Sequence, residues 1–444
     1  MTLVVGILNK RGAAIAADSA VTRNRDKGGP QQERKVTKNG NKMVRLSDVD
    51  PIAVMITGNA CFLDVPWDVI IRRYRQQNGT VHQPTVEAAA KAFFNYIASN
   101  AVFWSDEACN GMVMYLARFL FKEARDKMID EDERNKDFSL KRPAAFRKAF
   151  IRNVQNIAKS FAREGTCPQF AGYSLEEFRT SAAAVLDRFF EKIDHDYQKG
   201  ARRNRYPMDI LEQIRPSFEK ALLTMMSSRM EIEDILAMLV FTGYGTDQEY
   251  PSLVSAAVSE GYASRVNYSI RPQDIICISD KRPVAICPFA QDDVIKSILR
   301  GVHRSWLKPA AKGIQDLTGY SSGLSVLDPF EGEKALGYDF KLMLGEVDDW
   351  DLLEKFGKDW DRRMDSNQRE WEKKLKNYDL EAMASLADSL IDLTGFHRIL
   401  TFSEEGVGGL VDLAVISRNE GFTWLRRKSW YHKDVGGKDG QFGI

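Results

Sequence analysis

The chain has 444 residues, enough for two or three ordinary domains or for one domain with large insertions. Hydrophobic residues make up 44% and charged residues 28%, which is typical of a soluble globular protein with a sizeable core. The 63 basic residues balance 62 acidic residues, so net charge does not favour binding to nucleic acid or to a membrane surface.

Cysteine usage and hydropathy indicate a cytoplasmic protein. The five cysteines are scattered and form no CxxC pair, which is typical of free thiols in a reducing compartment. The apolar run at 3–8 is too short for a signal-peptide core, and no run of about 18 apolar residues follows. The five histidines lack the spacing of metal ligands, and no GxxxxGK[ST] phosphate loop is present, so we expect neither metal nor cofactor. The basic cluster at 199–205 is interpreted as a solvated helical face, so no nucleic-acid partner is expected.

The first hundred residues predict two strand pairs followed by two helices. Strands at 3–8 and 13–17 are joined by "NKRG", and a polar loop is expected at 22–41. The stretches 42–47 and 51–58 predict a second strand pair that ends at a glycine. We then expect one helix capped by Asp64 with Pro66 in its first turn, and a second helix that begins near Thr85.

The remainder alternates helical and strand-like stretches. Helical, charged sequence fills about 109–230, and strand-like runs return from 235 to about 290. A short helix, an irregular stretch and a stripe of aromatic residues at helical spacing between Trp360 and Tyr378 come next. The helix "MASLADSLIDLT" and a hairpin made by "GVGGLVDLAVIS" and "GFTWLRR" close the chain.

The opening stretch "TLVVGILNKRGAAIAADSAVT" resembles the N-terminus of a mature proteasome β subunit or of the bacterial proteasome-like peptidase. Both are N-terminal-nucleophile hydrolases. "NKMVRLS" is similar to the lysine-bearing strand of that family, and "VMITGNA" to its oxyanion turn. The resemblance implies an α+β fold, a four-layer αββα sandwich with helical insertions. It divides the chain into a discontinuous core at 2–108 and 231–430, insertions at 109–230 and 302–380, and a tail at 431–444.

The resemblance also implies the roles of four residues. Thr2, freed by removal of Met1, would be the nucleophile, and its own α-amine the base, because an α-amine has a pKa near 7.7. Lys42 would lower the pKa of that amine and stabilise the alkoxide, and Asp18 would hold Lys42. The backbone N–H of Gly58 would bind the oxyanion. Because a charge at an active site contributes to catalysis rather than to the core, Lys42→Ala is expected to abolish hydrolysis without unfolding the protein.

The function implied is cleavage of peptide bonds through an acyl-enzyme intermediate. Its partners would be a peptide or protein substrate, further copies of the chain in a homo-oligomer, and a separate ATP-driven unfoldase. Two departures leave alternatives open: "ICPFAQDD" lacks the supporting serine of the family, and in "EEGVGG" Glu404 and Val407 stand where the family has aspartate and serine. A catalytically silent scaffold or sensor is one alternative, and an amidohydrolase of small amides is the other.

Overall fold

A computed structural model describes most of the chain, namely residues 3–19, 21–24, 34–37, 41–134, 143–199, 208–229, 232–290, 293–301, 362, 366–367, 369–401 and 410–427. No helix in these ranges combines the length and the apolar character that crossing a bilayer requires. The described elements are helices and antiparallel sheets, so the predicted α+β class is confirmed.

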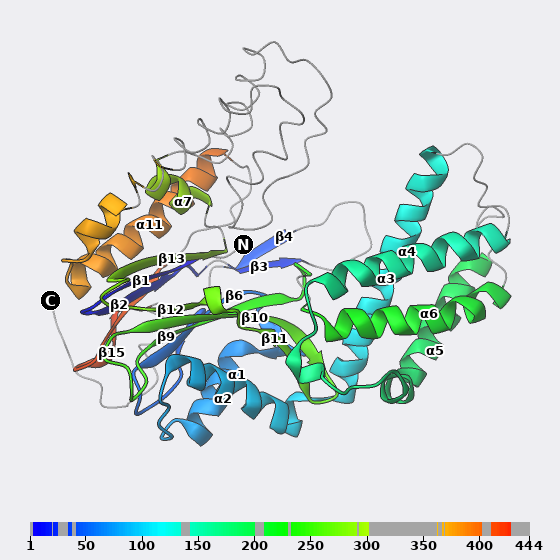
Figure 1. Cartoon of the computed structure of the whole chain (residues 1–444), viewed down its shortest axis with the longest axis horizontal. Helices are drawn as coiled ribbons and strands as arrows, with labels where there is room; N and C mark the ends of the chain where they lie inside the picture. Colours follow the sequence, from blue (N-terminus) through cyan, green and yellow to red (C-terminus); the bar gives the residue numbers. More distant parts are fainter. Residues whose placement is uncertain are drawn as a thin grey trace, which may run out of the picture.

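The first of two main sheets is built around the N-terminal hairpin (Figure 1). Its strand order is β13-β1-β2-β14-β15, and every neighbouring pair is antiparallel. The bounds are β1 Leu3–Asn9, β2 Gly12–Ala17, β13 Val284–Ala290, β14 Asp412–Ser417 and β15 Gly421–Arg426. Of the neighbouring strands in this sheet, β2 and β14 are the pair farthest apart in sequence, so the closing hairpin completes the sheet that the opening hairpin begins.

The second sheet has the order β11-β10-β9-β6-β5, and β12 also pairs with β10. The bounds are β5 Met43–Arg45, β6 Ile52–Gly58, β9 Leu236–Gly243, β10 Ser252–Tyr262, β11 Arg265–Ser269 and β12 Ile275–Cys277. The strands β6 and β9 pair across more than 170 residues of intervening sequence, because the helical segment of the chain lies between them.

Two smaller strand pairs were not expected. β3 Val21–Asn24 pairs with β4 Arg34–Thr37, and all but the first residue of this pair fall in the stretch 22–41 for which a loop was predicted. Both strands carry β-branched residues, which favour extended backbone even in a polar setting. β7 Cys61–Phe62 pairs with β8 Val65–Pro66 through a two-residue turn.

Helices cover the outer face of each sheet. The second sheet is covered by α1 Trp67–Asn78 and α2 Val86–Ser99, and the first by α7 Asp293–Arg300 and α11 Leu380–Thr401 (Figure 1). The predicted cap Thr85 is confirmed, since its hydroxyl accepts from the Ala88 N–H at 3.0 Å. The predicted cap Asp64 is wrong, because the N-cap of α1 is Pro66 and Asp64 lies in the β7–β8 turn.

Three buried clusters separate these layers. The faces of the two sheets that meet contribute alternate strand residues such as Val4, Ala17, Met55 and Val240 to one cluster. The opposite side chains of β1 and β2 pack against α7 and α11. The outer side chains of the second sheet pack against α1 and α2. The alternation follows from the two-residue period of a strand, which sends successive side chains to opposite faces.

The helical stretch between β8 and β9 holds four long helices that pack on one another and on the second sheet. They are α3 Asp106–Arg134, α4 Pro143–Arg163, α5 Leu175–Lys199 and α6 Met208–Ser227. Short 3₁₀ turns lie at Ala101–Phe103 and Pro168–Phe170 in this stretch, and a third lies at Pro272–Asp274 between β11 and β12. The apolar side chains of these helices belong to the same buried cluster as α1 and α2, so this segment shares a core with the second sheet. Most of the predicted insertion at 302–380, and the tail at 431–444, lie outside the described residues.

Candidate active site

A buried ion pair links the two sheets where β1 begins. The Lys42 ammonium donates to Asp18 Oδ1 at 2.7 Å, and the same oxygen accepts the backbone N–H of Leu3 at 3.0 Å. The Asp18 N–H in turn donates to the Leu3 carbonyl at 3.1 Å. Asp18 follows the last residue of β2 and Lys42 precedes β5, so one side chain comes from each sheet. The structure therefore brings together two of the four residues predicted from the sequence.

This pair is shielded from solvent. The side chain of Asp18 is 0% exposed and that of Lys42 is 6% exposed, so neither charge is in contact with bulk solvent. Burying an ammonium and a carboxylate costs several kcal/mol for each ion, and only close pairing with further hydrogen bonds offsets that cost.

Gly58 lies at the same end of the second sheet. The Ile56 N–H donates to the Lys42 carbonyl at 2.8 Å, which aligns Lys42 with a position two residues before Gly58, about 7 Å along the strand. Gly58 is exposed and has φ of +78°, a backbone conformation that favours glycine. A Cβ at this position would lie 2.3 Å from the Leu236 carbonyl oxygen, so the turn admits no side chain without movement.

Several predicted positions lie outside the described residues. Thr2 is one of them, and the described chain begins at the next residue, Leu3. Glu404 and Val407 are also outside the described ranges. The geometry above therefore concerns Asp18, Lys42 and Gly58.

Two buried polar residues near this end did not stand out in the sequence. Asp412 is 2% exposed and lies opposite Ala17 in the sheet register. Its neighbours Ala414 and Ile416, on the same side of β14, face the cluster between the sheets. Ser19 is buried and donates its hydroxyl to the Leu410 carbonyl. An acidic residue inside the apolar run "GLVDLAVI" was the available signal for Asp412.

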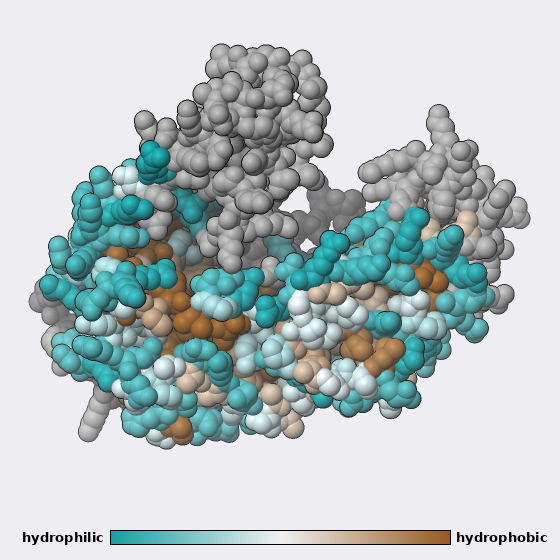
Figure 2. All heavy atoms as spheres, viewed as in Figure 1, coloured by the Kyte–Doolittle hydropathy of each residue, from teal (hydrophilic) through white to brown (hydrophobic). Residues whose placement is uncertain are grey.

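A cavity of about 570 Å³ lies along the edge strand β13. Figure 2 shows hydrophobic surface in patches over the layer of the sheets and over the helical segment. The lining of the cavity is mixed, with apolar side chains beside charged ones, and includes Met238, Ser255, Cys287, Phe289, Lys296 and Trp371. Asp18, Lys42 and Gly58 are not in this lining. Because Phe289 pairs with Val4, the cavity approaches the beginning of β1.

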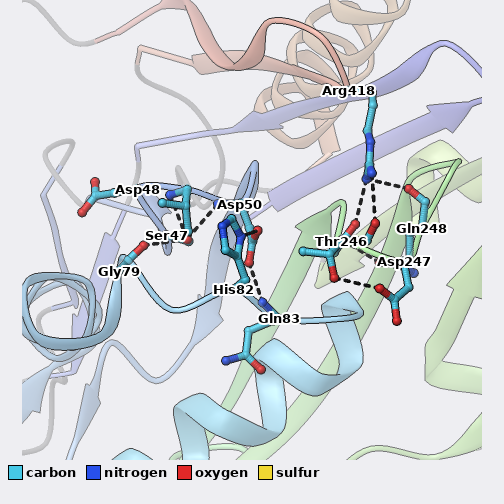
Figure 3. Close-up of polar contacts among 12 residues, drawn as sticks. Ser47, Asp48, Asp50, Gly79, His82, Gln83, Thr246, Asp247, Gln248 and Arg418 are labelled. Atoms are coloured by element: carbon cyan, nitrogen blue, oxygen red, sulfur yellow. Dashed lines mark hydrogen bonds and ion pairs between the residues drawn. The ribbon is translucent and has the colours of Figure 1, made fainter.

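The opposite end of the two sheets is closed by a polar cluster (Figure 3). Arg418, in the turn between β14 and β15, donates to the carbonyls of Gly245, Thr246 and Gln248 in the β9–β10 loop. The carboxylate of Asp50 binds His82 Nδ1 at 2.8 Å and the Gln83 N–H at 2.7 Å. These bonds fix loops to one another, and His82 here has a structural partner.

The two buried thiols, Cys167 and Cys287, do not favour nucleophilic chemistry. Burial raises the pKa of Cys287 to about 12 and that of Cys167 to about 11, so both are thiols at neutral pH. Within the described ranges, no group of three or more His, Cys, Asp or Glu side chains is arranged to hold a metal ion.

The chain matches no protein-family model, and a search of the curated proteins found no match to it.

Proposed function

We propose that this protein is an N-terminal-nucleophile hydrolase that cleaves amide bonds of peptides through Thr2. The observation that carries the proposal is the buried Lys42–Asp18 pair bonded to the backbone of Leu3. Thr2 is covalently bonded to Leu3, so its hydroxyl and its amine have only a short reach from that pair.

The arrangement of layers supports the same proposal. Two antiparallel sheets packed face to face, with helices on both outer faces, have the order of the αββα sandwich that the N-terminal resemblance implies. The proposed core is discontinuous, with α3 to α6 as an insertion between β8 and β9.

The proposed reaction has two steps. In the first, the Thr2 hydroxyl oxygen bonds to the substrate carbonyl carbon while the Thr2 α-amine takes the hydroxyl proton. The Gly58 N–H stabilises the oxyanion, the C–N bond breaks, and the amine passes the proton to the leaving nitrogen. In the second, water attacks the resulting ester, which releases the acid and restores Thr2.

Lys42 and Asp18 have electrostatic roles in this scheme. A neighbouring ammonium disfavours protonation of the Thr2 amine, which keeps more of that amine in the basic form at neutral pH. Asp18 fixes Lys42 and, through the Leu3 N–H, also fixes the chain beside the nucleophile. One carboxylate oxygen therefore orients both the cation and the backbone that carries Thr2.

Partners follow from the resemblance and stay part of the proposal. We propose a peptide or protein substrate, a homo-oligomer, and delivery by a separate ATP-driven unfoldase. An apolar stripe on α11 supports contact with another chain: Leu393, Phe396 and Leu400 are 49%, 62% and 69% exposed. Their spacing of three and four residues places them on one side of the helix.

A catalytically silent scaffold is the second candidate. It is favoured by "ICPFAQDD", which has no serine where the family has a supporting one. An amidohydrolase of small amides would use the same residues and differ in substrate alone.

The N-terminus of the purified protein tests the proposal. We expect N-terminal sequencing and intact mass of protein from its native host to show Met1 removed and Thr2 first, because the mechanism needs a free Thr2 amine. Complete retention of Met1 would contradict the hydrolase and favour the scaffold.

A further inference from the structure

The turn that follows Gly58 has an unfavourable backbone. The two residues between β7 and β8, Leu63 and Asp64, have φ of 44° and 66°. Positive φ at both central positions is the geometry of a tight hairpin turn that asparagine and glycine favour. Leucine rarely adopts it, so surrounding contacts must hold this turn in place.

One carboxylate supplies those contacts from the neighbouring strand. Glu260 Oε1 accepts from Asn59 Nδ2 at 2.9 Å, and Glu260 Oε2 accepts the backbone N–H of Leu63. The Asn59 side chain also accepts the Cys61 N–H at 3.2 Å. Asn59 directly follows Gly58, so the two oxygens of Glu260 bind both the beginning of the segment that follows Gly58 and its β7–β8 hairpin turn. Residues 58–64 are called the Gly58 turn below.

Glu260 is itself placed by an irregularity of β10. The pairing of β10 with β11 shifts register between Val258 and Gly261, and Glu260 has φ of 52°. Irregularities of this kind redirect a side chain that would otherwise follow the strand alternation. The strained backbone at both ends of this contact indicates a site whose geometry has been selected.

We propose that Glu260 is a positioning residue for the Gly58 turn, which it holds through Asn59 and Leu63 in the geometry that directs the Gly58 N–H to the substrate oxyanion. This inference rests on the proposed hydrolase function. Glu260 contacts no reacting atom in this scheme and acts through the turn.

The same carboxylate makes the turn sensitive to pH near neutrality. Burial raises the pKa of Glu260 to about 7, with a contribution from the nearby charge of Asp64, although the bonds from Leu63 and Asn59 favour the ionised form. From α3, the Cys109 thiol lies near Glu260, and Asp106 lies near that thiol. Above this pKa both oxygens accept hydrogen bonds, whereas protonation turns one oxygen into a donor and weakens the hold on the turn.

The test is the rate of covalent labelling by a β-lactone probe between pH 5.5 and 8.5 for the wild type, Glu260→Gln and Glu219→Gln. We expect Glu260→Gln to label about tenfold more slowly at pH 8, since a displaced oxyanion donor costs less than the roughly 100-fold to 1000-fold effect of losing one. The ratio of wild-type to variant rate should fall toward one at pH 5.5. The pKa of the Thr2 amine affects both proteins and cancels in this ratio.

Glu219→Gln is the matched control, because Glu219 is a buried glutamate on α6 that binds Arg179 and Arg215. Its ratio to wild type should stay independent of pH. A pH-independent ratio for Glu260→Gln as well would overturn the role of Glu260. Absence of wild-type labelling at every pH would instead overturn the proposed function.

A second measurement does not depend on activity. Hydrogen exchange of a peptide covering 59–67 should be faster in both Glu260→Gln and Asn59→Ala than in wild type at pH 8, because each variant removes a bond that holds the turn. Unchanged exchange in both variants would contradict the positioning role even if the protein is a hydrolase.

Discussion

The Lys42–Asp18 pair differs from the ion pairs on the surface in how much solvent it meets. Lys91 and Glu87 are at a similar distance, 2.6 Å, but their side chains are 56% and 36% exposed. Exposed pairs contribute about 0–1 kcal/mol, whereas removal of one partner of a buried pair costs about 3–5 kcal/mol. The difference arises because the remaining buried charge loses the counter-ion that offset the cost of its removal from water.

We therefore predict that Lys42→Ala lowers the free energy of unfolding by about 3–5 kcal/mol, and that Lys91→Ala changes it by less than about 1 kcal/mol. This replaces the expectation from the sequence that Lys42→Ala leaves the fold intact. Urea unfolding monitored by circular dichroism measures both variants. Equal stability of the two would show that Asp18 is compensated by other groups.

Some of the site could be predicted at the level of residues, and some could not. Asp18 and Lys42 were identified by the resemblance of the stretches that carry them, and the structure brings the two side chains into contact. Glu260 and Asp412 depend on the register of strands that are far apart in sequence, and on the register shift in β10. Sequence periodicity specifies which side of a strand a residue takes, but not which distant strand lies beside it.

Among the elements, β11 connects the second sheet to the helical segment α3 to α6 through hydrogen bonds of one buried side chain, Asn267. Asn267 is 3% exposed and donates to the carbonyls of Met226 and Ser228 at 2.9 and 2.8 Å, at the end of α6. The Cys167 thiol donates to the Asn267 side-chain oxygen at 3.0 Å. One side chain thus joins three segments.

Asn267→Ala should destabilise the protein by about 1–3 kcal/mol more than Asn153→Ala, because it leaves buried carbonyls without donors. Asn153 is the control: it is equally buried in α4, and its Nδ2 finds no hydrogen-bond partner in the described part of the chain. Thermal unfolding of both variants provides the comparison. A cost for Asn267→Ala no larger than that of Asn153→Ala would mean that packing alone holds the helices.

The elements that the sequence predicts well are those with several residues of regular pattern. The strands of the first hairpin and the helix beginning after Thr85 are examples, since apolar periodicity and a capping residue agree there. The β7–β8 hairpin has two residues in each strand and non-glycine residues in its turn, so neither period nor turn chemistry marks it. Its geometry depends on Glu260, which lies about two hundred residues away in the chain.

At the scale of the whole molecule, the two ends of the paired sheets differ. One end is closed by Arg418 and the loops that it binds, and the other holds the buried pair beside the beginning of β1. The helices α3 to α6 share their core with the sheet that carries Gly58. The sheets that carry the Lys42 end are therefore held in place by the Arg418 contacts at the opposite end and by the helices on the outer face of the second sheet.

The most direct test of the central proposal is covalent labelling of Thr2 by an epoxyketone or β-lactone probe, read by mass spectrometry. Wild type, Thr2→Ala and Thr2→Ser are compared as full-length proteins. We predict an adduct on residue 2 of the wild type and no adduct on Thr2→Ala, which lacks the hydroxyl. Thr2→Ser should be labelled more slowly than the wild type, because it keeps the hydroxyl but loses the methyl group that restricts the side-chain rotamer. Labelling of Thr2→Ala at the wild-type rate, or of none of the three, would contradict the account.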